Sequence, residues 1–422
     1  MRVKAFIILS LMVLLVSCNN KKYPKNETIV FEKPYPHIID IKEGYGNPTE
    51  IKLSSIADSI KYIVLSKEKD VIIDAFPDLQ MTDSDIYINF RGLIYRFAMS
   101  GKFLNTIGKN GRGPEEYMSG SQFAISSSNN NVYVKRNYMD DYISYKSSGE
   151  FIGKIALKKS DNIWEFRCLS DSIFMYTFYY IFMRDKSLED IILCGLFDMK
   201  GDKIQVIEHP AKKTPSDIDN SRLGIPPPGF TYFNNEVVLS YIDTVYKINS
   251  DSITTGFILK WSDIPHRQTF EELFYRQSEP LKKVTKSGQF LESYGKAYFI
   301  LKDFNDYYLF EYDKITGITK SMLSGVADKF SYVNDIEVGF VNDIDGGVNY
   351  YPKCTNNSGD IWIDWDDSFD FKKVHNKDFL SKSNAVYPDR KEELREFLNS
   401  LKEDDNPVLK VVYLKKQLNI QF

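Results

Sequence analysis

The sequence is poor in the residues that build metal centres and disulfide frameworks. Its 422 residues include only four histidines and four cysteines. The histidines are far apart and none belongs to an H-x-x-x-H or H-E pair, which argues against a transition-metal site. Three cysteines lie in or beside apolar segments, where we expect free buried thiols. A Cys168–Cys194 disulfide, formed in an oxidising compartment, is the alternative. The residues concerned are His37, His209, His266, His375, Cys168, Cys194 and Cys354.

Motifs of nucleophilic catalysis and of nucleic-acid binding are also missing. The chain has no G-x-S-x-G sequence, and no cysteine has a paired histidine nearby. Its formal net charge is -4 and the basic residues are scattered along the chain. We therefore expect no catalytic residue of these types and no nucleic-acid partner.

The N-terminus is typical of an export signal. A short basic region precedes an apolar run from Ala5 to Val16, which is too short for a comfortable membrane span. The run leads into Leu15-Val16-Ser17-Cys18, which resembles the bacterial lipobox, in which the cysteine becomes the lipidated first residue. The sequence therefore predicts a lipoprotein signal peptide over 1–17 and a tether and lead-in over 18–49. An ordinary signal peptide with an incidental cysteine is the alternative.

A lipidated Cys18 would anchor the protein in a bacterial envelope. Several acyl chains on one cysteine bury enough CH₂ groups, at ~0.8 kcal/mol each, for stable membrane attachment. The residues after Cys18 lack the acidic run that accompanies surface export in some such lipoproteins. The expected location is the outer membrane, facing the periplasm, with the membrane contacted through the anchor.

Repetition organises the rest of the chain. Two apolar strands and a glycine turn first appear as Ile86-Tyr87-Ile88, Ile94 to Phe97 and Gly101. The turn glycines Gly101, Gly149 and Gly201 lie about fifty residues apart, which is the period of a four-stranded β-propeller blade. The pattern predicts an all-β fold, a six-bladed propeller of antiparallel blades over 50–422 with short helical insertions. The further copies begin at Val132, Ile173, Val237, Ala297 and Ile361.

Closure of such a ring requires its first and last segments to share a blade, because an unpaired edge would recruit other chains. We expect the segments Ile60 to Leu65 and Val408 to Leu414 to complete one terminal blade. Two insertions are predicted to be helices that pack on the propeller, over 263–277 and 389–401. The second has an apolar stripe and a capping box of Asp389 with Glu392.

Two motifs resemble a known family. The loop G-K-N-G-R-G-P-E-E-Y from Gly108 to Tyr117, and the ending E-D-D-N-P-V-L-K from Glu403 to Lys410, are similar to those of six-bladed β-propeller lipoproteins of Bacteroidota. These proteins are akin to NHL-repeat and TolB-like propellers. The resemblance covers most of residues 50–415. It implies a propeller in the cell envelope and no defined reaction.

The loop from Gly108 to Tyr117 is the most conspicuous motif. It is not a phosphate-binding loop, because no Lys-Ser/Thr pair and no helix follow it. We interpret it as a tight crossing to the next blade, with glycines for positive φ and Pro114 as a rigid stop. Four of its side chains are candidates for a ligand-facing position in the central funnel, namely Arg112, Glu115, Glu116 and Tyr117.

Carboxylates are candidates for a calcium site. Propellers of the lactonase type use carboxylates and amides from several blades around one Ca²⁺. Solvated acidic loops on the rim are the simpler interpretation, so no cofactor is predicted and calcium alone is kept open. The candidates by residue type are Asp343, Asp345, Asp364, Asp366 and Asp367.

Four Asp-Ser/Thr-apolar triplets resemble the acceptor sequence for O-glycosylation in envelope proteins of Bacteroidota. The alternative is a turn ahead of a strand, since Asp and Ser favour turns. The acceptor hydroxyls would be those of Ser59, Ser172, Thr244 and Ser252.

The leading hypothesis for function is a lipid-anchored, non-catalytic propeller that binds or scaffolds an envelope protein, peptide or glycan. A metal-assisted hydrolase or lyase in the central funnel is the first alternative, resting on fold analogy alone. A glycan- or peptide-binding component of a nutrient system is the second, because the chain is rich in aromatic residues, with 28 Tyr and 29 Phe.

Overall fold

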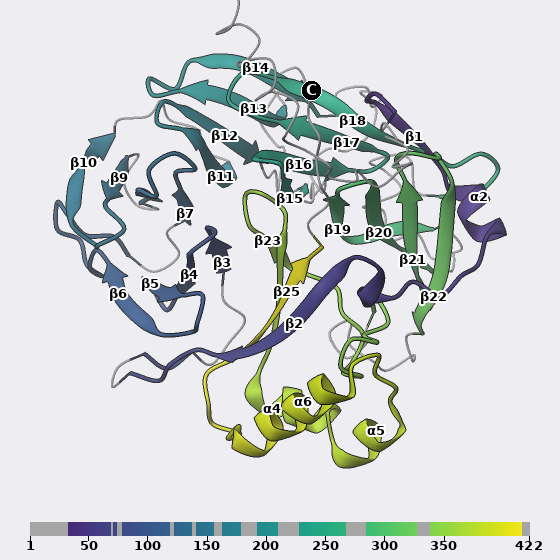
Figure 1. The fold of residues 1–422 in the computed structure, drawn as a ribbon. Helices are drawn as coiled ribbons and strands as arrows, with labels where there is room; N and C mark the ends of the chain where they lie inside the picture. Colours follow the sequence, from purple (N-terminus) through teal and green to yellow (C-terminus); the bar gives the residue numbers. More distant parts are fainter. Residues whose placement is uncertain are drawn as a thin grey trace, which may run out of the picture. The chain divides into compact units, whose positions relative to one another are not determined.

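In the computed structural model, the described residues form six four-stranded antiparallel sheets, one of which gains a fifth strand that pairs in parallel. These sheets belong to one compact unit, Lys33–Phe422. The predicted six-bladed propeller is confirmed, and Figure 1 shows the blades around a common centre. The structure describes residues 33–68, 71–73, 78–118, 122–136, 141–155, 163–178, 192–209, 228–266, 284–326 and 338–415.

The first three blades each comprise four consecutive strands. Blade 1 consists of β3 (Asp78–Met81), β4 (Asp85–Phe90), β5 (Leu93–Ala98) and β6 (Phe103–Ile107). Blade 2 consists of β7 (Gln122–Ile125), β8 (Val132–Lys135), β9 (Tyr142–Tyr145) and β10 (Phe151–Ile155). Blade 3 consists of β11 (Ile163–Ser170), β12 (Ile173–Phe178), β13 (Ile192–Asp198) and β14 (Lys203–Glu208).

The last three blades complete the ring. Blade 4 consists of β15 (Gly229–Phe233), β16 (Glu236–Tyr241), β17 (Thr244–Ile248) and β18 (Ile253–Lys260). Blade 5 consists of β19 (Thr285–Ser293), β20 (Lys296–Asp303), β21 (Asp306–Asp313) and β22 (Thr319–Val326). Blade 6 consists of β23 (Cys354–Thr355), β24 (Ile361–Asp366), β25 (Val408–Leu414) and β2 (Ala57–Val64).

Blade 6 closes the ring with both ends of the domain. Strand β25 lies between β24 and β2, with Val412 opposite Trp362 on one side and Ile60 on the other. The predicted sharing of one blade by the first and last segments is thus confirmed. Because β25 is a central strand, its backbone hydrogen bonds are used on both sides and no free edge is left there.

Short turns connect the strands where the sequence supplies residues that tolerate a left-handed backbone. Asn234 and Asn235 join β15 to β16 with φ of 53° and 61°. Such two-residue turns match the twist of a hairpin, and asparagine adopts them readily. The predicted turn glycines Gly101, Gly149 and Gly201 all have positive φ, at 82°, 88° and 76°.

The hydrophobic core is divided among the interfaces between blades. Tyr87 and Ile94 of blade 1, for example, pack with Val134 and Ile143 of blade 2. Comparable clusters join each further pair of neighbouring blades, including blade 6 with blade 1. A strand between two such clusters is covered on both faces, which is why β4 is almost entirely buried instead of alternating.

Part of the predicted lead-in belongs to the propeller. Strand β1 (His37–Asp40) pairs in parallel with β18 and adds a fifth strand to blade 4. Asp40 then caps helix α2 (Ile41–Gly46) by accepting the N–H groups of Lys42 and Glu43 at 3.0 and 3.3 Å. A short 3₁₀ helix, η1 (Leu53–Ser55), precedes β2. The sequence did not predict strand β1, because four residues beside a proline carry little periodic signal.

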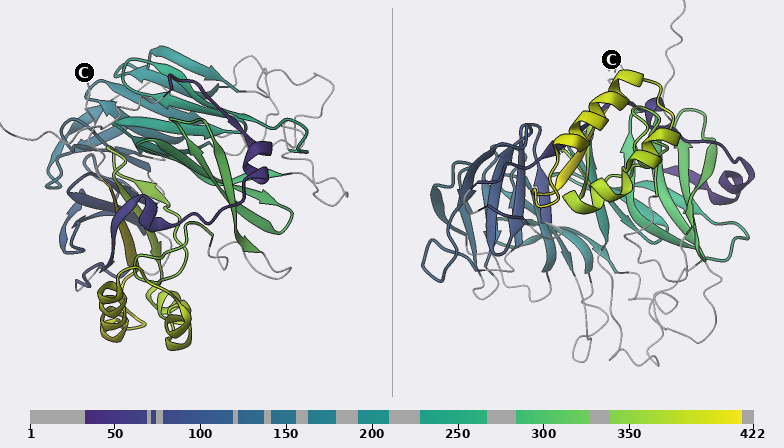
Figure 2. Two further views of the ribbon diagram at one scale, coloured as in Figure 1. Left: turned by 45° about the vertical axis from the view of Figure 1, so that its right-hand side comes forward. Right: turned by 90° about the horizontal axis from the view of Figure 1, so that it is seen from below.

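Three helices lie between β24 and β25. They are α4 (Ser368–Val374), α5 (Lys377–Lys382) and α6 (Pro388–Ser400), and Figure 2 shows them gathered together. Leu394 and Leu401 pack with Phe371 and Val408, so the predicted packing of the last helix on the propeller is confirmed. Its predicted capping box is wrong: Pro388 begins the helix, and the N-cap residue Tyr387 makes no side-chain capping bond. The predicted helix over 263–277 falls mostly outside the described residues.

Candidate functional site

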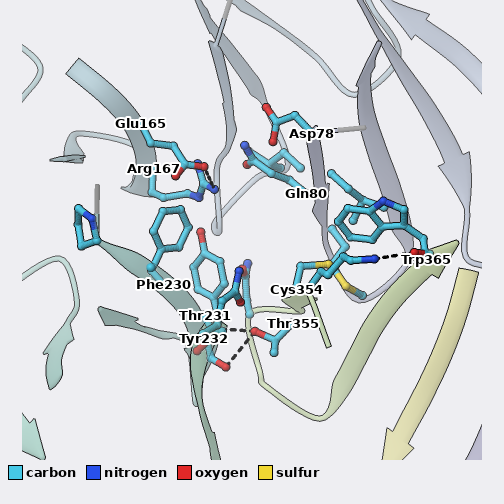
Figure 3. Close-up of a pocket in the computed structure, with 18 residues that line it drawn as sticks. Asp78, Gln80, Glu165, Arg167, Phe230, Thr231, Tyr232, Cys354, Thr355 and Trp365 are labelled. Atoms are coloured by element: carbon cyan, nitrogen blue, oxygen red, sulfur yellow. Dashed lines mark hydrogen bonds and ion pairs between the residues drawn. The ribbon is translucent and has the colours of Figure 1, made fainter. Parts of the chain in front are cut away.

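A cavity of about 380 Å³ lies at the centre of the propeller. It is lined by the first strand of every blade, namely β3, β7, β11, β15, β19 and β23, and by Trp365 of β24. Its polar lining comes from different blades, because the innermost strands of a propeller converge on one axis. Figure 3 shows Glu165, Arg167 and Phe230 on one side of it, and Cys354 and Trp365 on the other.

A hydrogen-bonded clasp joins blades 4 and 6 beside the cavity. The Thr355 hydroxyl accepts the N–H of Tyr232 at 2.7 Å and donates to the C=O of the same residue at 3.1 Å. The following turns are also joined, since the N–H groups of Asn234 and Asn235 donate to the carbonyls of Ser358 and Asn357 at 3.0 and 2.8 Å. Blades 4 and 6 are thus linked directly, which fixes the positions of the Tyr232 and Thr355 side chains.

Arg167 is the buried cation of the cavity. Its Nη2 donates to Glu165 Oε1 at 2.6 Å, and its Nη1 donates to the backbone carbonyl of Phe166 at 2.7 Å. The guanidinium also lies 4.2 Å from the centre of the Phe230 ring, within the range of a cation–π interaction. Burial alone would lower the pKa of Arg167, but the neighbouring Glu165 carboxylate raises it, so the side chain stays charged.

Asp78 supplies a carboxylate that makes no hydrogen bond or ion pair within the part of the chain that the structure describes. It begins β3 and reaches the water of the cavity, although protein from several blades surrounds it. This partial loss of hydration, together with the negative charge of Glu165, raises the pKa of Asp78 to about 6. Arg167 acts in the opposite direction but is already paired with Glu165.

Lys353 and Trp365 form the opposite wall. The Lys353 ammonium donates to the Trp365 carbonyl at 2.6 Å and pairs with Asp364 at 2.7 Å. It lies 4.9 Å from the centre of the Trp365 ring. The indole itself is only 9% exposed, and its N–H has no hydrogen-bond partner.

Two further buried polar atoms of the lining have no partner, the Nε of Arg167 and the Oε1 of Gln289. Buried polar atoms are nearly always hydrogen-bonded, because leaving one unmade costs about 1–3 kcal/mol. Three such atoms in the described part of the chain thus belong to residues that line this cavity, which makes it a candidate place for a hydrogen-bonding ligand or for water.

The side chains predicted to face the funnel lie elsewhere. None of Arg112, Glu115, Glu116 and Tyr117 lines the cavity. Tyr117 is 1% exposed, accepts the N–H of Ile94 at 3.0 Å and donates to the carbonyl of Ile107. Glu116 accepts the N–H of Gly113 at 2.8 Å, so its carboxylate closes the loop on itself. Arg112 and Glu115 are exposed on the loop.

The crossing between blades is confirmed, with one change in its explanation. The loop connects the last strand of blade 1 to the first strand of blade 2. Only its first glycine, Gly108, has positive φ, at 65°. Gly111 is instead required because the Glu116 carboxylate occupies the space beside it: a Cβ added at Gly111 would lie 2.0 Å from Glu116 Oε2.

The five aspartates considered for calcium have protein partners at separate places. Asp364 and Asp366 both pair with Lys410, at 2.5 and 2.7 Å. Asp367 caps α4, Asp343 accepts from Ser54, and Asp345 accepts from Asn342 and Gly347. Within the described part of the chain, no group of three or more His, Cys, Asp or Glu residues is placed to hold a metal ion.

The remaining candidates are the possible modification sites and the cysteines. Ser172, Thr244 and Ser252 lie in or at turns before strands, whereas Ser59 lies inside β2, and the triplets remain untested as modification sites. Cys18 lies outside the described residues. The cysteines Cys168, Cys194 and Cys354 are free, as expected. Among the helices that the structure describes, none has the length and apolar character needed to cross a membrane.

The lining residues were missed because the repeat was aligned on the wrong strand. Each copy recognised in the sequence begins with the second strand of a blade, as at Ile86 in β4 or Ile361 in β24. The innermost strands precede those copies, and their length varies from the two residues of β23 to the nine of β19. A polar residue at this place in several repeats, such as Gln80, Glu165 and Gln289, was the available signal.

Comparison with known proteins identifies one family and one fold. The family model described as "Domain of unknown function (DUF4934)" matches residues 36–413. A Bacteroides fragilis protein described as exported has 15% identity and a TM-score of 0.60, covering 90% of this chain and 99% of its own. A DUF4221 member from Bacteroides vulgatus has 14% identity and a TM-score of 0.41, with coverages of 86% and 98%. No curated protein shows significant similarity to the sequence.

Proposed function

The chain belongs to the family described as domain of unknown function DUF4934, and within that family we propose that it is a non-catalytic binding module of the cell envelope. Its ligand site is the central cavity. The proposal gives the propeller the role of a rigid frame that holds side chains from six blades around one small molecule or one protruding group of a larger partner.

One observation carries this proposal, namely the convergence of all six innermost strands on a cavity whose lining keeps unpartnered polar atoms. A volume of about 380 Å³ lies within the usual size of small-ligand sites, which are concave and have a few convergent polar groups. The lining is also rigid, because Arg167, Lys353 and Thr355 are each fixed by hydrogen bonds or ion pairs.

The cavity has little support as a reaction centre. Burial raises the pKa of the Cys354 thiol, so this residue is a poor nucleophile near neutral pH. The aspartates that would serve a metal-assisted hydrolase or lyase are committed to Lys410, Ser54 and Asn342. A binding role therefore has more support than the metal-assisted alternative.

Envelope attachment through Cys18 is part of the proposal. It is supported by the signal-like N-terminus and by the similarity in fold to a protein described as exported. Cys18→Ser should leave a soluble or uncleaved protein without lipid. Metabolic labelling with a fatty acid tests this, and undiminished label in the variant would contradict it.

The ligand site is tested with a cavity-filling variant of the full chain. Gly229 lines the cavity, and a Cβ added there meets no atom closer than 3.8 Å, so Gly229→Leu should fold and occupy ligand space. Gly153→Leu is the matched control, because a Cβ at that outer-strand position has nothing within 4 Å. Ligand-detected NMR with a fragment library of mixed charge should find binders that Gly229→Leu loses and Gly153→Leu keeps. Binding that survives Gly229→Leu would overturn the site, as would a library without any binder.

A further inference from the structure

We infer that the central cavity binds a neutral saccharide, with Asp78 and Trp365 as hydrogen-bonding partners of its hydroxyl groups. This inference rests on the proposed function and names the ligand class of the same site. The inference is based on two features of the lining: its cations are already paired with protein carboxylates, and several of its polar groups have no hydrogen-bond partner among the described residues.

A cationic ligand is disfavoured by the aromatic walls. Cations bind aromatic cages by lying over the ring faces. In this cavity the protein supplies those cations itself, since Arg167 lies 4.2 Å from the Phe230 ring centre and Lys353 lies 4.9 Å from the Trp365 ring centre. The ring surfaces that these two cations contact are therefore not available to a cationic group of a ligand.

An anionic ligand is disfavoured by the same pairs. Arg167 is bound to Glu165 at 2.6 Å and Lys353 to Asp364 at 2.7 Å, so neither cation is left with a free charge. Among the charged residues of the described cavity lining, Asp78 is the one outside these ion pairs, and it is a carboxylate. An acidic ligand would meet a like charge there.

A neutral ring with several hydroxyl groups fits what remains. Hydroxyls donate and accept, and the cavity offers both kinds of partner. Asp78 is an acceptor that reaches the water of the cavity, and two lining residues add buried groups that no atom of the described residues uses, the Oε1 acceptor of Gln289 and the indole N–H donor of Trp365. Tyr232 adds an aromatic ring to the lining, of the kind that suits the C–H faces of a sugar.

The cavity volume of about 380 Å³ restricts the ligand to one or two sugar units or to the end of a longer glycan. The terminal sugar units could belong to a glycan polymer or to a free oligosaccharide, because both present the same terminal groups to the cavity. Free sugars and a glycan array separate these sources.

The test uses the full chain in detergent and a matched set of probes. Neutral probes are glucose, galactose, mannose, N-acetylglucosamine and their disaccharides, and charged probes are glucosamine and glucuronate. Calorimetric titration should detect a neutral sugar that binds at least about tenfold more tightly than the charged probes. Asp78→Asn replaces a charged acceptor by a weaker neutral one, and Trp365→Phe removes the indole N–H. Each should weaken that binding about tenfold, the difference expected for one charge-assisted or one neutral hydrogen bond. Glu115→Gln, on the exposed crossing loop, should leave it unchanged.

Each result has a defined meaning. Tighter binding of glucosamine or glucuronate would overturn the inference. Binding that is insensitive to Asp78→Asn would also overturn it, and because Asp78 is exposed we expect this variant to fold. If no saccharide binds but the fragments excluded by Gly229→Leu do, or if peptides compete for the cavity, the saccharide assignment fails and the binding module stands. If neither fragments nor saccharides bind, both fail.

Discussion

The crossing loop at 108–117 and the central cavity differ in how far their polar side chains are hydrogen-bonded within the protein. In the loop, Glu116 accepts a backbone N–H at 2.8 Å, and the Tyr117 hydroxyl is used on both sides by Ile94 and Ile107. In the cavity, Trp365, Gln289 and Arg167 each keep a buried polar atom without a partner. The Glu116 and Tyr117 side chains of the loop are therefore satisfied within the protein, whereas the cavity keeps unpaired polar atoms, which our proposal assigns to a ligand.

The difference shows that a conspicuous sequence motif can have a structural role and lie outside the ligand site. Much of the dense motif G-K-N-G-R-G-P-E-E-Y is explained by folding, because Gly108, Gly111, Glu116 and Tyr117 have local structural roles. A ligand site built from one or two residues per blade leaves no contiguous motif. In a propeller, the dispersed polar residues of the innermost strands are the better guide to function.

The largest effect on folding is expected from removal of the strand that closes the ring, which belongs to the scaffold and not to the cavity lining. Deleting Asn406 to Phe422 takes away β25 and exposes edges of both β2 and β24. It also removes the Asn406 side chain, which binds the backbone of Ser66, Val71 and Ile73. We expect broad unfolding in a thermal melt. A melting midpoint equal to that of the full chain would contradict the closure.

Within the loop, the largest effect is expected at Gly108. Its φ is +65°, and an added Cβ would lie 2.6 Å from the Tyr145 ring. Gly108→Val should lower the free energy of unfolding by about 1–3 kcal/mol. Gly111→Val should cost less, because the atom in its way is the mobile end of Glu116. Denaturant unfolding of both variants measures this, and an equal or reversed order would contradict the explanation.

In the cavity, Asp78→Asn should change how stability depends on pH. The pKa of Asp78 is raised from 3.8 to about 6 in the folded protein, so the fold binds this proton more tightly than the unfolded chain does. The carboxyl therefore stabilises the fold at pH values below about 4 and loses that contribution as pH rises towards 6. The variant should lack this loss and be relatively more stable at pH 8. Unfolding curves at pH 4, 6 and 8 decide the point, and parallel profiles would refute it.

The smallest effect is expected for the glutamates of the loop. Glu115→Gln and Glu116→Gln keep side-chain size, and the second keeps an oxygen that can accept the Gly113 N–H. Each should change the free energy of unfolding by less than about 0.5 kcal/mol, as exposed substitutions commonly do. Loss of sugar binding in either variant, with an unchanged melt, would move the site from the cavity to the loop.

The sequence allowed the ring to be predicted because its signals repeat. Glycine turns at Gly101, Gly149 and Gly201 and paired apolar strands occur blade after blade, and closure needs one terminal strand to pair with the other. Strand β1 and helices α4 and α5 were beyond such reasoning, since they are short and occur once. Their positions depend on tertiary packing instead of local pattern.

The candidate site was less predictable for a physical reason. Asp78, Arg167 and Trp365 are distant in sequence and meet only because three blades place them around one axis. No spacing rule relates them, and the sequence does not show that the cavity cations Arg167 and Lys353 are each paired with a carboxylate. The sequence analysis named Asp364 but could not show that Lys353 and Lys410 neutralise it.

The most direct measurement compares sugar affinity in two variants that each change one carboxylate to an amide. Calorimetric titration of the best neutral saccharide is carried out on Asp78→Asn and on Glu116→Gln, with the unaltered full chain as reference. The account predicts about tenfold weaker binding for Asp78→Asn and unchanged binding for Glu116→Gln, because only Asp78 lies in the cavity. Unchanged binding for Asp78→Asn with weakened binding for Glu116→Gln would contradict it.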